Sequence, residues 1–241
     1  MVWTERTEAR PFAARRLVCF PHAGGSPYFF RSWGKALTDF EVHVVRYPGR
    51  AERISEPPAT DLKGMAREVA AELLSSADDR PLAFFGHSMG AFVAYEVAHL
   101  LQERGRRVSH FFASAARGPR TTNGTPEKAL ALDDQSILRT LRQLGGTDAE
   151  LLDNPVFLEL VMPYVTADFR MVAGYAATPG PLDCPVTALL GETDTRVTPE
   201  EAAAWEQSAG GAFELLTFAG GHFYLADDPP FAVVEGASYA D

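Results

Sequence analysis

The chain has 241 residues, of which 46% are hydrophobic and 22% charged, and its formal net charge is −10. This length suits one globular domain with a substantial core, so we expect residues 1–241 to form a single domain. The negative charge argues against nucleic acid and anionic membranes as partners, although a local basic patch would still allow an acidic protein to dock.

The chain does not begin with a basic segment followed by an apolar one, and no apolar run is long enough to cross a membrane. We therefore expect a cytoplasmic protein. Cys19 and Cys184 both lie in apolar runs and are expected to be buried thiols. The six histidines lack the spacing of metal ligands, so we predict no metal site and no cofactor of the protein's own.

Residues 16–20 form an apolar run that predicts a buried strand, and the segment that follows contains Gly24 and Gly25. A strand that leads into a glycine pair at this point is where an α/β hydrolase builds half of its oxyanion hole. We therefore interpret the backbone N–H of Ala23 as an oxyanion donor, and we expect His22 to shape the loop. An ordinary turn between a strand and a helix remains the alternative.

Strands and helices are predicted to alternate in the first half of the chain. After the strand at 16–20 we predict helices at 26–33, 61–77 and 91–101. The strands predicted between and after them lie at 41–46, 81–85 and 108–114. This alternation predicts the α/β class, with a mostly parallel central sheet and helices on both faces.

The turn between the strand at 81–85 and the next helix has the pattern Gly-x-Ser-x-Gly, with Ser88 at its centre. Strand, sharp turn and helix are the context of a nucleophile elbow, in which glycines flank a serine held in strained backbone geometry. Ser88 is therefore the predicted nucleophile, and the N–H of Met89 is the second predicted oxyanion donor. A turn of small residues that only lets strand and helix pack is the alternative.

Between about residues 118 and 181 the alternation stops, and helices begin after Asp133 or Asp134 and after Pro155. The second of these helices is apolar on two stripes. One stripe consists of Leu158, Met162, Val165 and Phe169, and the other of Phe157, Val161, Tyr164 and Tyr175. Because a surface helix needs one apolar stripe, we interpret the segment as an inserted helical lid. We assign Leu158, Met162, Val165 and Phe169 to substrate binding; both stripes serving as ordinary core is the alternative.

Two further residues follow predicted strands near the end of the chain. Asp194 follows the strand at 185–190, and His222 follows the strand at 213–218. The order Ser88, Asp194, His222 is that of the α/β-hydrolase triad, in which histidine activates the serine and aspartate orients the histidine. Glu192 is a rival for the acid.

Several motifs together resemble those of the type II thioesterases, stand-alone editing hydrolases of polyketide and non-ribosomal peptide synthesis with the α/β-hydrolase fold. They are FPHAGGS at 20–26, YPGRAER at 47–53, EPP at 56–58, GHSMG at 86–90, PYVTADF at 163–169 and GGHF at 220–223. The resemblance implies that an acyl or peptidyl carrier protein presents a thioester on its phosphopantetheine arm, and that the enzyme clears aberrant acyl groups from it.

Arg50 and Arg53 are candidate contacts for an acidic carrier protein, but their role as solvated or internally paired charges is an equal alternative. We expect a monomer. A general carboxylesterase or acyltransferase with the same triad, or a non-catalytic subunit that binds carrier proteins, would have the same fold and motifs, because function depends on the site built on a fold.

Overall fold

The computed structural model describes residues 2–121, 128 and 133–239. Within these residues the chain forms a seven-stranded sheet in which β1 is antiparallel and every other pair is parallel. In spatial order the strands are β1 (Thr4–Arg6), β3 (Phe40–Val45), β2 (Arg15–Phe20), β4 (Leu82–His87), β5 (His110–Ser114), β6 (Val186–Gly191) and β7 (Phe213–Phe218). The α/β class is confirmed, whereas β1, which is three residues long, has no counterpart among the predicted strands.

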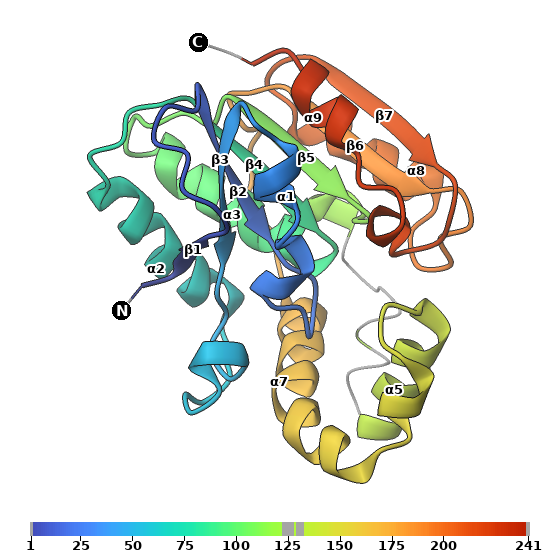
Figure 1. Ribbon diagram of the computed structural model, residues 1–241. Helices are drawn as coiled ribbons and strands as arrows, with labels where there is room; N and C mark the ends of the chain where they lie inside the picture. Colours follow the sequence, from blue (N-terminus) through green and yellow to red (C-terminus); the bar gives the residue numbers. More distant parts are fainter. Residues whose placement is uncertain (1, 122–127, 129–132, 240–241) are drawn as a thin grey trace.

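Helices cover both faces of the sheet (Figure 1). On one face lie α2 (Leu62–Ser75), α3 (Met89–Gln102) and α8 (Pro199–Ala203); on the other lie α1 (Trp33–Ala36) and α9 (Phe231–Gly236). Alternate residues of β2 point to opposite faces, so Val18 and Phe20 pack with α2 and α3, while Leu17 and Cys19 pack on the α1 side. The helix predicted over 26–33 is divided into a 3₁₀ helix, η1 (Pro27–Phe30), and α1.

Further 3₁₀ helices occur in the connections: η2 (Ala51–Arg53), η3 (Pro119–Thr121), η4 (Ala204–Ser208) and η5 (Tyr224–Ala226). None of the described helices is long and apolar enough to pass through a lipid bilayer.

Between residue 133 and β6 the structure describes three α-helices, which we call the lid helices: α5 (Asp134–Leu144), α6 (Ala149–Leu152) and α7 (Pro155–Gly174). The side chain of Asp133 caps α5 by accepting a hydrogen bond from the Ser136 N–H, and Asn154 caps α7 in the same way. Residues 122–127 and 129–132, which fall within the predicted lid, lie outside the described residues.

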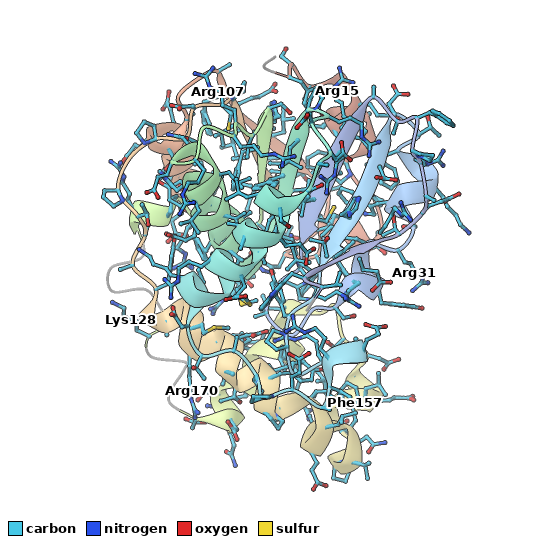
Figure 2. The ribbon with its side chains drawn as sticks, turned by 90° about the vertical axis from the view of Figure 1, so that its left-hand side faces the viewer. Arg15, Arg31, Arg107, Lys128, Phe157 and Arg170 are labelled. Carbon is cyan, nitrogen blue, oxygen red and sulfur yellow. The ribbon has the colours of Figure 1, made fainter. Side chains whose placement is uncertain are left out.

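The lid helices lie at one end of the molecule. Figure 1 shows α5 and α7 together beyond the edge of the sheet, and in Figure 2 Phe157 and Arg170 of α7 lie at the opposite end from Arg107. Arg107 precedes β5, so it marks the amino ends of the parallel strands. The lid helices therefore face the carboxyl ends, where open parallel sheets bind their ligands.

Candidate active site

Ser88 lies at the sharp turn between β4 and α3 with φ 54° and ψ −120°, a conformation that is strained for a residue with a side chain. Two close approaches explain the glycines beside it. A Cβ on Gly86 would lie 2.4 Å from the Cα of Ala91, and one on Gly90 would lie 1.9 Å from the carbonyl oxygen of Phe20. The turn therefore requires glycine on both sides, and it presents Ser88 at the carboxyl end of the sheet.

The structure brings the three predicted triad residues together. The Oγ of Ser88 lies 3.0 Å from Nε2 of His222, and Nδ1 of His222 lies 2.8 Å from Oδ2 of Asp194. Both distances are those of good hydrogen bonds. In this arrangement Nδ1 donates to the carboxylate, which leaves Nε2 as the acceptor for the serine hydroxyl.

Backbone contacts hold the acid and the histidine in place. The other carboxylate oxygen of Asp194 accepts hydrogen bonds from the N–H groups of Arg196, at 2.7 Å, and Val197, at 3.3 Å. The loop of His222 passes so close to β6 that a Cβ on Gly191 would lie 2.1 Å from the carbonyl oxygen of Gly221. Glu192, the rival acid, has an exposed side chain, whereas the Asp194 side chain is fully buried.

The two predicted oxyanion donors belong to residues that line the cavity around Ser88. Ala23, Met89, Ser88 and His222 line the same cavity, and within the described residues neither the Ala23 nor the Met89 N–H donates to another protein group. Met89 is the first residue of α3, where the helix dipole favours negative charge. These two amides are therefore available to an oxyanion that forms next to Ser88.

The other two histidines near the site are neutral. Burial, with smaller effects of His222 and Arg50, lowers the pKa of His22 to about 3. Burial likewise holds the pKa of His87 well below its usual value, and Nδ1 of His87 lies 2.9 Å from the Ser114 hydroxyl. The ring of His22 packs edge-on against Phe29 and Phe223, which agrees with its predicted part in shaping the loop.

Two adjoining cavities meet at Ser88 and His222. The first extends towards Arg117 and Arg196, which lie in the segments that follow β5 and β6. The second, which we call the lid chamber, is enclosed mainly by apolar side chains of the lid helices: Leu141, Leu144, Leu152, Phe157, Val161, Tyr164, Val165 and Phe169. An apolar chamber next to a nucleophile suits an acyl chain.

Residues from both apolar stripes of α7 line the lid chamber. Of the four residues assigned to substrate binding from the sequence, Val165 and Phe169 line the chamber. The structure places Leu158 and Met162 outside the lining, where they pack in the core of the lid helices. Phe157, Val161 and Tyr164 of the other stripe line the chamber. The sequence does not indicate which stripe of the helix faces the chamber, because both stripes are apolar.

The hypothesis that Arg50 and Arg53 contact an acidic carrier protein is wrong, because both side chains are buried. Arg50 is 2% and Arg53 6% exposed. Arg50 forms two contacts with the carboxylate of Asp168, and Arg53 forms two with the carboxylate of Glu56. The alternative of internally paired charges is the one the structure supports.

The parallel sheet, the strained serine after β4 and the linked histidine and aspartate define a hydrolase of the α/β-hydrolase fold. The family model for the thioesterase domain matches residues 15–237, so the chain belongs to the thioesterase family. The site sits within this matched region.

Known thioesterases are similar to the chain in sequence and in structure. Thioesterase PikA5 of Streptomyces venezuelae is 39% identical over 230 residues, which are 94% of this chain and 81% of the relative. The type II thioesterase BorB from the borrelidin biosynthetic cluster is 35% identical with a TM-score of 0.86, covering 97% of this chain and 96% of that one. YbtT, a type II thioesterase from the yersiniabactin NRPS/PKS pathway, has the same TM-score and coverage at 28% identity.

Proposed function

We propose that this thioesterase hydrolyses acyl groups from the phosphopantetheine arms of acyl or peptidyl carrier proteins and so clears aberrant or stalled intermediates from a synthase. The observation that carries the chemistry is the chain of contacts from Ser88 through His222 to Asp194, at 3.0 Å and 2.8 Å, beside two unengaged amides. The carrier-bound substrate is supported by similarity to BorB and YbtT, which are type II thioesterases of biosynthetic pathways.

The first step is acylation of Ser88. His222 Nε2 takes the hydroxyl proton as Oγ attacks the thioester carbonyl, and Asp194 stabilises the imidazolium that forms. The carbonyl oxygen becomes an oxyanion that the Ala23 and Met89 N–H groups would bind. Collapse of this intermediate breaks the carbon–sulfur bond, and the pantetheine sulfur leaves as a thiol with the proton from His222.

The second step is hydrolysis of the acyl-enzyme. A water molecule gives a proton to Nε2 of His222 and attacks the ester carbonyl, and the same two amides stabilise the second oxyanion. The Ser88 hydroxyl then leaves with that proton, and the carboxylic acid is released. Protein side chains and water suffice for both steps, so the proposal includes no cofactor or metal.

The substrate preference has two physical sources. A thiol with a pKa near 8.5 is a better leaving group than an alkoxide, which favours thioesters over oxygen esters in the first step. The lid chamber is lined mainly by apolar side chains and would receive the acyl chain. A docked carrier protein would then place its phosphopantetheine arm beside Ser88, in the part of the site that the acyl chain leaves open.

A panel of substrates tests the proposal. The same acyl group is offered on a carrier protein, on a small carrier-free thiol and as an oxygen ester, and release of the acid is followed for each. We expect the highest kcat/KM with the carrier protein. A preference for the oxygen ester would indicate a carboxylesterase instead. No turnover, together with no labelling of Ser88 by a fluorophosphonate, would indicate a non-catalytic subunit.

A further inference from the structure

A buried ion pair joins the lid to the body next to the active site. Asp168 of α7 is fully buried, and both of its oxygens contact Arg50, with Nη2 to Oδ1 at 2.8 Å and Nη1 to Oδ2 at 2.5 Å. The guanidinium also lies against the ring of Tyr164, 4.7 Å from its centroid. A buried pair of this kind loses the hydration of both charges and is often no more stabilising than apolar residues of the same size. Stability alone is therefore a weak reason for its presence.

Asp168 has a third partner, in the loop that carries the predicted oxyanion donor. Its Oδ2 accepts a hydrogen bond of 2.8 Å from the N–H of Gly24. The loop is packed tightly against the same helix, since a Cβ on Gly24 would lie 3.1 Å from Cγ2 of Val165. The carboxylate thus connects Arg50, α7 and the residue directly after Ala23.

These hydrogen bonds fix the peptide planes on both sides of Ala23. In a trans peptide the C=O and the N–H point in opposite directions. The carbonyl of His22 is held by the N–H of Gly25 at 2.8 Å, which directs the Ala23 N–H the other way. The next peptide is held through the Gly24 N–H by Asp168. Without the Asp168 carboxylate, the second plane loses the hydrogen bond that holds it, and a rotation of this plane would shift Ala23.

We propose that Asp168 and Arg50 are positioning residues that keep the Ala23 N–H aimed at the reacting carbonyl. Arg50 holds the carboxylate, and the carboxylate holds the loop, so the oxyanion site is complete when α7 is seated on the body. This inference rests on the proposed function, because it assigns the pair to the same hydrolytic reaction. It predicts that the pair affects kcat and leaves KM nearly unchanged, because the oxyanion is absent from the bound substrate and forms only as the reaction proceeds.

The test compares two double variants that both remove the charges and differ in whether the side chain at position 168 carries an oxygen that can accept a hydrogen bond. Asp168→Asn/Arg50→Met keeps an oxygen that can accept from the Gly24 N–H, whereas Asp168→Leu/Arg50→Met has the same shape without an acceptor. Because neither variant leaves an unpaired buried charge, both are expected to fold. On a carrier-free acyl thioester of N-acetylcysteamine we expect the Leu variant to lose about 10²-fold in kcat, and the Asn variant to stay within about tenfold of wild type.

The rate at which a fluorophosphonate labels Ser88 is measured in parallel, because its oxygen occupies the same site whichever substrate is natural. We expect the Asn variant to label faster than the Leu variant. Equal kcat and equal labelling rates in the two variants would overturn the inference, and so would an effect confined to KM. A wild-type protein that labels but hydrolyses no thioester would instead overturn the proposed function.

Discussion

Gly90 lets the two segments that carry the proposed oxyanion donors, Ala23 and Met89, approach each other closely, and Gly90→Ala should separate these segments. A Cβ at this position would lie 1.9 Å from the carbonyl oxygen of Phe20, 2.5 Å from its carbonyl carbon and 2.7 Å from the carbonyl oxygen of Pro21. All three are backbone atoms, and ordinary contact begins at 3.4 Å. The start of α3 and the end of β2 would therefore have to move apart by about 1.5 Å, because no side chain can rotate to make room.

This movement acts directly on the chemistry. Met89 precedes Gly90, and Ala23 follows Pro21 by two residues, so the two amides are carried by the segments that separate. Loss of one oxyanion donor costs about 3 kcal/mol of transition-state stabilisation, which is a fall in kcat of about 10²-fold or more. Overpacking should also lower the free energy of unfolding by about 1–3 kcal/mol.

The assay measures kcat on a carrier-free thioester together with urea unfolding. Gly174→Ala is the matched control, because Gly174 ends α7 and a Cβ there has nothing within 4 Å. We expect this variant to keep wild-type kcat and stability. A folded Gly90→Ala protein with the kcat of the control would refute the reasoning.

Two further predictions concern the lid chamber and acid stability. Val161→Phe should shorten the chamber and lower kcat/KM for the longest accepted acyl chain at least about tenfold more than for an acetyl group, whereas Val156→Phe, at a side chain that is 75% exposed, should not. His22→Phe should reduce the loss of stability in acid. In the wild type His22 stays neutral when folded but is protonated in the unfolded chain below about pH 6.5, so this one group lowers the free energy of unfolding by about 2 kcal/mol between pH 7 and pH 5. The Phe variant should lack this contribution.

The readouts are an acyl-length series for the first prediction and urea unfolding at the two pH values for the second. Equal effects of the two Phe variants on long and short acyl chains would contradict the position of the lid chamber. An unfolding free energy that falls as steeply in His22→Phe as in wild type would contradict the neutral state of His22.

Local patterns are sufficient to predict the elements that position the triad. Ser88, Asp194 and His222 each follow a strand whose neighbours are parallel, so the topology brings them to one edge of the sheet. The cap of α5 can also be narrowed to Asp133 or Asp134, because side-chain capping is a contact within one turn, and the structure shows Asp133 in this role. Such contacts depend on residues close together in sequence.

Contacts between distant segments cannot be predicted in this way. Arg50 and Asp168 are 118 residues apart, and no local pattern indicates that they pair. The phase of α7 is equally hidden, because apolar side chains on two stripes allow either stripe to face the chamber. The pattern therefore assigns Leu158 to the substrate and omits Val161, whereas the structure places Val161 in the lining. Which apolar face meets which partner is decided by packing, which the sequence pattern leaves open.

Hydrolysis of an acyl-carrier protein by wild type and by Ser88→Ala tests the central claim most directly. Removal of the Oγ that lies 3.0 Å from His222 deletes the proposed nucleophile and leaves the apolar lining of the lid chamber intact. We predict that kcat falls by about 10⁴-fold or more while the variant stays folded and still binds the carrier protein. Turnover by folded Ser88→Ala within about tenfold of wild type would contradict an acyl-enzyme at Ser88.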